Sequence, residues 1–227
     1  MSTDAQATSA PPRVSARRCR EPELIERILR EDYFDEPMRS FSVTVRRAFA
    51  RAWCATRDEV YFVVSEVNGE YAGFVLAHTL GDRLIKDFAR AHPQHLPALV
   101  WTKLRPSQRA MRSEAAGPAD EEGRAKVDAE VEALNIKRVG QPFAWALADG
   151  RAGRVSLLFV GKNYRGHGLA PLMLERLDAE MRDGGVRVVE AHIDPYNLPS
   201  VRAFMKSGYE ITRMADKDFL ARKALEG

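Results

Sequence analysis

The amino-acid sequence predicts an α/β fold, in which helices and strands are interleaved along a single elaborated domain. One reason is size and composition, because 227 residues, 45% hydrophobic and 30% charged, supply enough apolar material for a sizeable core. A second is the Asn68-Gly69 pair between two β-branched and aromatic runs, which is a strong hairpin signal. A third is the succession of a strand, a glycine-rich loop and an amphipathic helix over residues 155–182.

The first eighteen residues, MSTDAQATSAPPRVSARR, are rich in Ser, Ala, Pro and Arg and lack the apolar stretch of a secretory signal. We expect residues 1–18 to form a flexible tail on a domain of residues 19–227, and the protein to be cytoplasmic. No stretch of the chain approaches the roughly 18 consecutive apolar residues of a membrane span. A membrane is therefore not an expected partner.

Two amphipathic helices and a hairpin are predicted in the first part of the domain. Residues 21–30 and 41–55 carry apolar side chains every three or four positions, which is helical spacing. Residues 60–67 and 71–78 are predicted to be antiparallel strands, because both residues of the Asn68-Gly69 turn tolerate a positive φ.

Residues 79–150 have a mixed pattern, with breaks at Pro106 and Gly117-Pro118. We interpret them as a mostly helical insertion and not as a second autonomous core. The helical candidates within the insertion are residues 82–91, 96–104 and 120–134.

The last part of the chain has the most regular pattern. A strand is predicted at residues 155–160, a loop at 161–168 and a helix at 169–182, with Pro171 in the first turn, where a missing N–H costs nothing. A strand, a short helix and two closing strands are then predicted at residues 186–193, 199–206, 209–213 and 219–223.

Charge and cysteine content argue against several function classes. The 35 Lys and Arg residues against 32 Asp and Glu give a net charge of +3, a weak excess compared with the basic stripes of nucleic-acid-binding proteins. Cys19 and Cys54 are too few for a disulfide framework or a four-ligand zinc site. We therefore expect no nucleic-acid partner and no metal site.

The loop at residues 162–168 carries the strongest functional signal. Its sequence KNYRGHG precedes a helix N-terminus, where exposed backbone N–H groups and the helix dipole favour a phosphate. A Walker loop does not match, because His167 and Gly168 stand where Lys and Ser or Thr are required. A dinucleotide fingerprint beginning at Gly166 does not match either, because Pro171 takes the place of its third glycine.

The pattern Arg165-x-x-Gly168-x-Ala170, just after a predicted strand, resembles the pyrophosphate-binding motif of the GNAT acetyltransferase superfamily. The segment NLPSVRAFMKSGY, which begins at Asn197, resembles the second motif of that family. The resemblance covers residues 54–223. It implies the GNAT-like acyl-CoA N-acyltransferase fold, a mixed central sheet flanked by helices, with the long insertion between the third and fourth strands.

The same resemblance implies acetyl-CoA as the cosubstrate and assigns residues to it. The backbone of Phe159 and Val160 would meet the pantetheine arm, and Asn197 would hydrogen-bond its amides. Phe204 and Lys206 would lie beside the thioester and the phosphate-bearing end. The pyrophosphate would be held by six consecutive residues, Arg165, Gly166, His167, Gly168, Leu169 and Ala170.

The expected catalytic groups depart from the family pattern. The tyrosine that often acts as general acid is replaced by Phe204, which has no proton to give. We take Tyr196 as the candidate acid and His192 as the candidate base. Other candidates are Tyr164 and Ser200 for the acid, and Asp194, His78 and Glu66 for the base.

The sequence thus predicts an N-acetyltransferase that moves an acetyl or other short acyl group from acyl-CoA to a primary amine. The acceptor is expected to be a small molecule such as an amino sugar or an amino-acid-like amine. We expect the insertion to build the acceptor site or an oligomer contact, and a homodimer is left open. One alternative is a non-catalytic acyl-CoA-binding sensor or regulatory module, and another is a protein that binds a different nucleotide at this loop.

Overall fold

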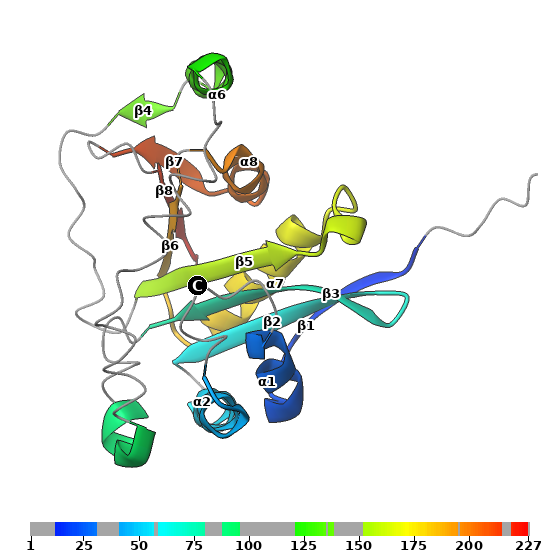
Figure 1. Cartoon of the computed structure of the whole chain (residues 1–227). Coiled ribbons are helices and arrows are strands. Elements are labelled where there is room, and N and C mark those ends of the chain that lie inside the picture. The colour runs from blue at the N-terminus through cyan, green and yellow to red at the C-terminus, as the bar shows by residue number, and fades with distance from the viewer. Residues whose placement is uncertain are drawn as a thin grey trace, which may run out of the picture.

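The computed structural model describes residues 12–30, 41–56, 59–79, 88–95, 121–134, 136–138, 152–194, 196–214 and 219–226. An eight-stranded sheet of order β1-β2-β3-β5-β6-β8-β7-β4 runs through it (Figure 1). Neighbouring strands are antiparallel, except that β5 with β6 and β4 with β7 are parallel. The strands are β1 (Val14–Arg18), β2 (Val60–Val67), β3 (Glu70–His78), β4 (Lys137–Arg138), β5 (Ala152–Val160), β6 (Val188–Ile193), β7 (Glu210–Arg213) and β8 (Phe219–Ala224).

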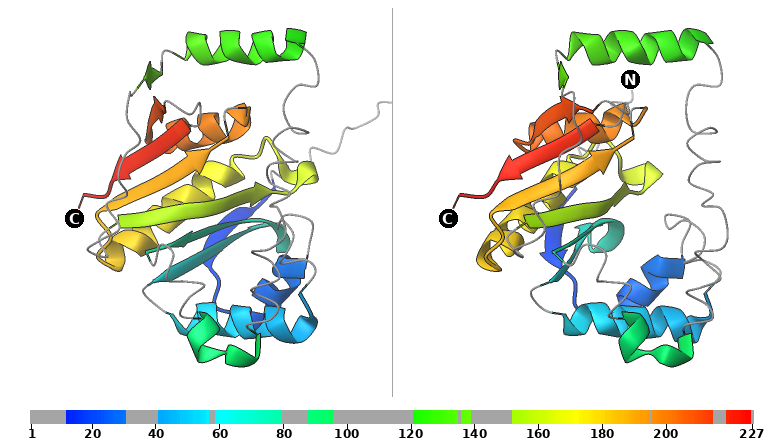
Figure 2. Two further views of the ribbon diagram at one scale, coloured as in Figure 1. Left: turned by 60° about the vertical axis from the view of Figure 1, so that its left-hand side comes forward. Right: turned by 90° about the vertical axis from the view of Figure 1, so that its left-hand side faces the viewer.

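Helices cover both faces of this sheet (Figure 2). Helices α7 (Leu169–Asp183) and α8 (Leu198–Lys206) pack on one face, and α1 (Pro22–Arg30) and α2 (Val43–Ala55) pack on the other. Helix α6 (Glu121–Ala133) lies beyond α8, at the end of the sheet formed by β7 and β4. The predicted mixed sheet with flanking helices is confirmed.

Each face of the sheet carries its own hydrophobic core. Side chains alternate between the faces along a strand, so Tyr61 and Val63 of β2 pack with α7 while Phe62 and Val64 pack with α1 and α2. Helix α7 begins at Leu169 and presents one fully buried stripe to the first core, consisting of Met173, Leu174, Leu177 and Met181. The helical spacing of these residues is what the sequence predicted.

The hairpin turn has the backbone that its sequence predicts. Asn68 has φ 53° and Gly69 has φ 85°, and the strands on either side pair as β2 and β3. The other predicted helices and strands outside the insertion are also found, with ends shifted by at most three residues.

The expectation of a flexible tail over residues 1–18 is wrong for its last part. Residues Val14–Arg18 form β1, which pairs antiparallel with β2 from Val14↔Val67 to Arg18↔Val63. An edge strand takes its stabilisation from backbone hydrogen bonds, so a polar sequence does not prevent it. Arg18 adds an ion pair to Glu180 of α7 at 3.2 Å and lies 4.6 Å from the centre of the Tyr61 ring.

The predicted insertion is described in part. The helix expected at residues 120–134 is confirmed as α6, and the candidate at 82–91 is described only from residue 88, where the chain is helical to residue 91. The candidate at 96–104 lies outside the described residues. The insertion also contributes β4, which pairs with β7 at the edge of the sheet.

Candidate functional site

Two neighbouring strands part in the middle of the sheet. β5 and β6 are paired from Ala152↔Val188 to Val155↔Ala191, although β5 continues to Val160. Beyond this last pair the two strands separate, and the edge of β5 that faces β6 has no ladder partner there among the described residues.

A register shift in β5 coincides with the separation. Leu76 of β3 lies opposite Leu157, whereas Ala77 lies opposite Val155. Ser156 is therefore an extra residue, which makes a β-bulge. Bulges increase the local twist of a strand and change its direction, so the bulge turns the end of β5 away from β6.

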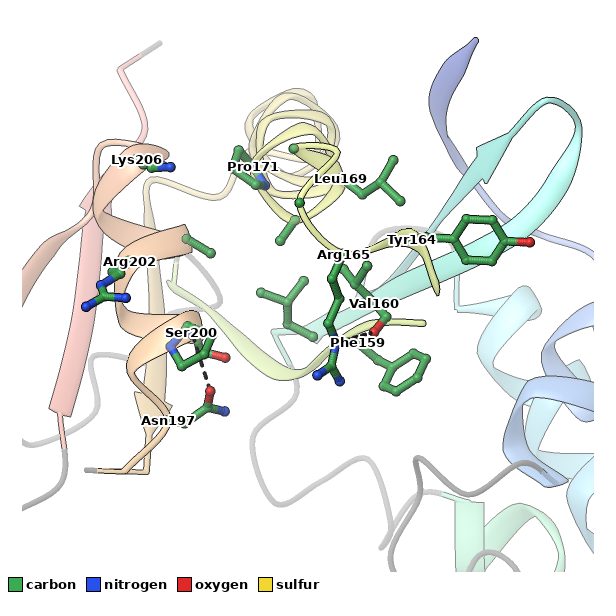
Figure 3. Close-up of a pocket in the computed structure, with 16 residues that line it drawn as sticks. Phe159, Val160, Tyr164, Arg165, Leu169, Pro171, Asn197, Ser200, Arg202 and Lys206 are labelled. Atoms are coloured by element: carbon green, nitrogen blue, oxygen red, sulfur yellow. Dashed lines mark hydrogen bonds between the residues drawn. The ribbon is translucent and has the colours of Figure 1, made fainter. Parts of the chain in front are cut away.

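A cleft of about 580 Å³ lies at this separation. Its walls are the end of β5, the loop of residues 161–168, the first turn of α7 and one face of α8 (Figure 3). Nine of the predicted cofactor-binding residues line it: Phe159, Val160, Arg165, Gly166, Gly168, Leu169, Ala170, Asn197 and Lys206.

Two glycines give the loop its shape at the N-terminus of α7. Gly166 has φ 86° and Gly168, the N-cap of α7, has φ 72°. Only glycine adopts this backbone region without strain. Because Gly168 has no side chain to cap the helix, the first N–H groups of α7 are left for another acceptor. This arrangement, with the positive end of the helix dipole, suits an anion.

The loop is fastened to the β2–β3 hairpin. The Tyr164 hydroxyl donates a hydrogen bond to the Glu70 carboxylate at 3.0 Å, and the Gly161 N–H donates to the Ala72 carbonyl at 2.8 Å. The bond to Glu70 raises the pKa of Tyr164. The hairpin therefore holds the loop in place from the side opposite α8.

Basic side chains from both walls meet at the cleft. Arg165 lies across the end of β5, where its Nε donates a hydrogen bond to the Val160 carbonyl at 3.3 Å (Figure 3). Lys206 reaches the cleft from the last turn of α8. The two positive charges and the α7 N-terminus favour a multiply anionic ligand.

Asn197 has the capping role that its position before a helix suggests, and it also lines the cleft. Its Oδ1 accepts a hydrogen bond from the Ser200 N–H at 3.2 Å. The side-chain amide carries two donor hydrogens besides this acceptor. Capping and contact with a ligand are therefore compatible at Asn197.

Two of the predicted cofactor-binding residues do not line the cleft. Phe204 is 2% exposed and packs in the core, with its ring centre 4.9 Å from that of Tyr209 at an interplanar angle of 85°. His167 is exposed on the loop. Sequence spacing places these residues on the correct elements but does not show which way their side chains point.

The candidate catalytic residues lie near the cleft and do not line it. His192 is half-buried on β6, directly after the last residue that pairs with β5. Tyr196 is half-buried in the turn before α8, where its N–H donates to the Asp194 carboxylate at 2.9 Å. Their catalytic roles stay predictions.

The alternative candidates are spread over several elements. Glu66 lies on β2 and is ion-paired with Arg17 of β1 at 3.1 Å. His78 is buried at the end of β3. Of the alternatives for the acid or the base, Tyr164 and Ser200 line the cleft, and the other three do not.

Sequence reasoning missed one basic residue of the cleft. Arg202 lines it from α8, four residues before Lys206 and so on the same face of the helix. That spacing from Lys206 is the signal that could have identified it.

A buried network behind the cleft was also missed. Asp178 of α7 accepts hydrogen bonds from the Tyr209 hydroxyl at 2.6 Å and from Lys223 Nζ at 2.7 Å. Burial raises the pKa of Asp178, although both bonds act to lower it, and burial also raises the pKa of Tyr209. Lys223 further donates to the Ser207 carbonyl at the end of α8. The network thus ties α7 to the C-terminus of α8.

The described residues contain neither a membrane-spanning helix nor a cluster of metal-binding side chains. No helix among them combines the length and apolar character that crossing a membrane requires. No group of three or more His, Cys, Asp or Glu side chains in the described part of the chain could hold a metal ion.

Solved structures share this fold. An acetyltransferase of the GNAT family from Streptococcus pneumoniae matches with a TM-score of 0.50 and 14% identity, over 94% of this chain and 100% of that one. The protein yncA from Salmonella typhimurium, solved with its cofactor acetyl-CoA, matches with a TM-score of 0.50 and 16% identity, over 94% of each chain. The GNAT domain of PAT from S. lividans has the same TM-score and identity, over 94% of this chain and 90% of that one.

The family match rests on the sequence itself. No curated protein matches the chain. The model of the acetyltransferase (GNAT) family matches residues 23–209, which includes the cleft and most of the sheet. This confirms the resemblance to that family and the predicted class of enzyme, an acetyltransferase. The chain belongs to the acetyltransferase (GNAT) family.

Proposed function

We propose that the cleft between β5 and β6 binds acyl-CoA and that the protein transfers the acyl group to a primary amine. The observation that carries this proposal is that one continuous cleft joins the end of β5, beyond its last pair with β6, to the N-terminus of α7 and to basic residues of the loop and α8. An exposed strand edge suits the amides of a pantetheine arm, and a helix N-terminus suits a pyrophosphate.

The cleft residues divide between these two parts of the ligand. The backbone of Val160 and the amide of Asn197 pair with pantetheine, whereas Phe159, whose carbonyl faces Gly73 of β3, contributes to the lining of the cleft. The first turn of α7, Arg165 and Lys206 take the phosphates. Arg165 must give up its bond to the Val160 carbonyl to do so, and that carbonyl is then free for a pantetheine N–H.

Transfer follows direct attack of the amine nitrogen on the thioester carbonyl carbon. The N–C bond forms and the C–S bond breaks, the nitrogen loses a proton and the sulfur gains one. His192 serves as the base and Tyr196 as the acid, because both lie on the β6 side of the separation. Backbone N–H groups at the Ser156 bulge polarise the carbonyl.

The acceptor in this proposal is a small-molecule amine such as an amino sugar or an amino-acid-like amine. The net charge of +3 is too small to favour a large acidic or nucleic-acid partner. Release of free thiol from acetyl-CoA, measured across a panel of amines, identifies the acceptor class.

Calorimetric titration with acetyl-CoA, CoA and ATP tests the site. Gly168→Glu places a carboxylate at the proposed pyrophosphate position and is expected to weaken acetyl-CoA binding by at least about tenfold, or 1.4 kcal/mol. Gly185→Glu is the matched control, because Gly185 also has a positive φ, 81°, but follows the other end of α7. The control should fold with similar strain and bind normally.

The outcomes separate the alternatives. Equal binding by both variants would show that the cofactor is not held at the α7 N-terminus. Binding of ATP in competition with CoA would favour the nucleotide-binding alternative. Binding of acetyl-CoA without its consumption in the presence of any amine would favour the non-catalytic sensor. Phe204 is the observation that favours this alternative, because its ring has no acidic group to protonate the leaving thiolate.

A further inference from the structure

Residues 121–134 and 136–138 of the insertion lie on the outer side of α8 (Figure 2). Leu134 and Ile136 pack against the core beneath α7, and β4 pairs with β7. Helix α6 lies beyond α8 (Figure 2), and its acidic residues form ion pairs with basic residues of α8 and β7. The pairs are Glu130 with Arg202 at 2.5 Å, and Asp128 and Glu132 with Arg213 at 3.8 and 4.0 Å. Ion pairs therefore link α6 to Arg202 at the wall of the cleft and to Arg213 of β7.

Arg202 is at once a residue of the cleft and a partner of the insertion. It lines the cleft on the same face of α8 as Lys206. In Figure 3 its guanidinium points away from Arg165 and Phe159, on the far side of α8. The ion pair with Glu130 accounts for that direction.

We propose that Glu130 limits the affinity of the enzyme for CoA by holding the Arg202 guanidinium away from the cleft. This inference rests on the proposed function, in which the phosphates of CoA lie between α7 and α8. An arginine binds phosphate with two parallel hydrogen bonds. Arg202 is thus a phosphate ligand that becomes available when its bond to Glu130 opens.

The ion pair between Arg202 and Glu130 can break because both side chains are exposed. The side chain of Arg202 is 54% exposed and that of Glu130 is 39% exposed. Exposed ion pairs are weak, and a long arginine side chain has several rotamers within reach. The phosphates of CoA together carry more negative charge than one carboxylate, and they compete with Glu130 for the same guanidinium.

Four variants isolate this competition. Glu130→Gln removes the competing charge and is expected to tighten CoA binding by about two- to fivefold, the range of a single exposed pair. Arg202→Gln removes the ligand and should weaken binding. Glu132→Gln is the matched control, because it takes the same charge from α6 but its partner, Arg213, does not line the cleft. The double variant Glu130→Gln/Arg202→Gln should bind like Arg202→Gln alone.

Calorimetric titration of each purified variant with CoA measures the dissociation constant, and circular dichroism verifies that the variant is folded. Tighter binding in Glu130→Gln that vanishes in the double variant supports the proposal. Equal effects of Glu130→Gln and Glu132→Gln, or a gain that survives in the double variant, would overturn it in favour of general electrostatics. If the unaltered protein does not bind CoA, the proposed cofactor site itself fails, and this inference fails with it.

A series of shortened ligands identifies the phosphate. If Arg202 contacts the 3′-phosphate, the gain in Glu130→Gln appears with CoA and is lost with dephospho-CoA. If Arg202 contacts the pyrophosphate, the gain is kept with dephospho-CoA and lost with pantetheine. A gain of equal size with pantetheine, which has no phosphate, would contradict phosphate binding by Arg202.

Discussion

Phe204 shows how the packing of one residue limits the chemistry of the site. It stands where the second motif of the family often has a tyrosine, and its ring is buried against Tyr209 with 2% exposure. A hydroxyl on this ring would be placed among apolar side chains of the core that α7 and α8 share. The position therefore contributes packing, and proton transfer to the leaving thiolate must come from another group.

Phe204→Tyr is expected to destabilise the protein by about 1–3 kcal/mol without raising turnover, because a buried hydroxyl without a partner loses its hydration. Urea unfolding and thiol release from acetyl-CoA measure the two effects. Tyr196→Phe is the comparison, since it removes the hydroxyl proposed as the acid and should lower turnover about 100-fold. Faster transfer by Phe204→Tyr would show instead that position 204 faces the thiolate.

At the scale of elements, the cleft depends on how closely β3 approaches β5. A Cβ on Gly73 would overlap the Phe159 carbonyl oxygen, which belongs to a backbone that cannot move without shifting β5. At Gly153 the corresponding obstacle is the end of the Met181 side chain, which is flexible. The two glycines therefore differ in what a methyl group would displace.

Gly73→Ala is expected to cost about 1–3 kcal/mol of stability, as overpacking does, and to weaken acetyl-CoA binding because the displaced strand lines the cleft. Gly153→Ala should cost less and leave the affinity unchanged. Thermal unfolding and calorimetry check both variants. Equal losses of affinity would mean that the position of β5 is not set by its contact with Gly73.

At the scale of the whole molecule, β8 neutralises one buried carboxylate on each face of the sheet. Adjacent strand residues point to opposite faces, so Lys223 reaches Asp178 while Arg222 reaches Glu190, with Arg222 Nε 3.3 Å from Glu190 Oε1. Burial raises the pKa of both carboxyl groups, and the cationic partners act in the opposite direction. A raised carboxyl pKa means that the folded protein resists ionisation more than the unfolded chain does.

The stability of the whole protein should therefore depend on pH through these groups. The contribution of Glu190 is fully present below its ordinary pKa of 4.5 and is lost as the pH rises through the higher folded value. The free energy of unfolding of the natural protein minus that of Glu190→Gln is expected to fall over that window and then level off. Urea titrations at a series of pH values measure it, and a constant difference would contradict the assignment.

The local features of this protein were predictable from its sequence. The apolar spacing predicted helix α7, Asn68-Gly69 predicted the hairpin, and two glycines ahead of a helix predicted the loop before α7. These depend on backbone preferences and on periodicity within a few residues. The motif at Asn197 was recognisable for the same reason, since a capping asparagine and the helix after it are contiguous.

Features that depend on distant segments could not be predicted in the same way. Val14–Arg18 gave no strand signal, because β1 is stabilised by the open edge of β2, about fifty residues later. The Asp178 network joins three segments, and none of them alone marks the carboxylate as buried.

The sequence by itself therefore determined the class of fold, the glycine-rich loop before α7 and the family, because each depends on a short contiguous pattern of residues. Only the tertiary structure decided that the Ser156 bulge separates β5 from β6 and that Phe204 turns into the core. It also decided that Glu130 of the insertion lies against Arg202 at the wall of the cleft. The physical reason is that side-chain direction, burial and ion pairing depend on which elements pack together, and no single segment contains that information.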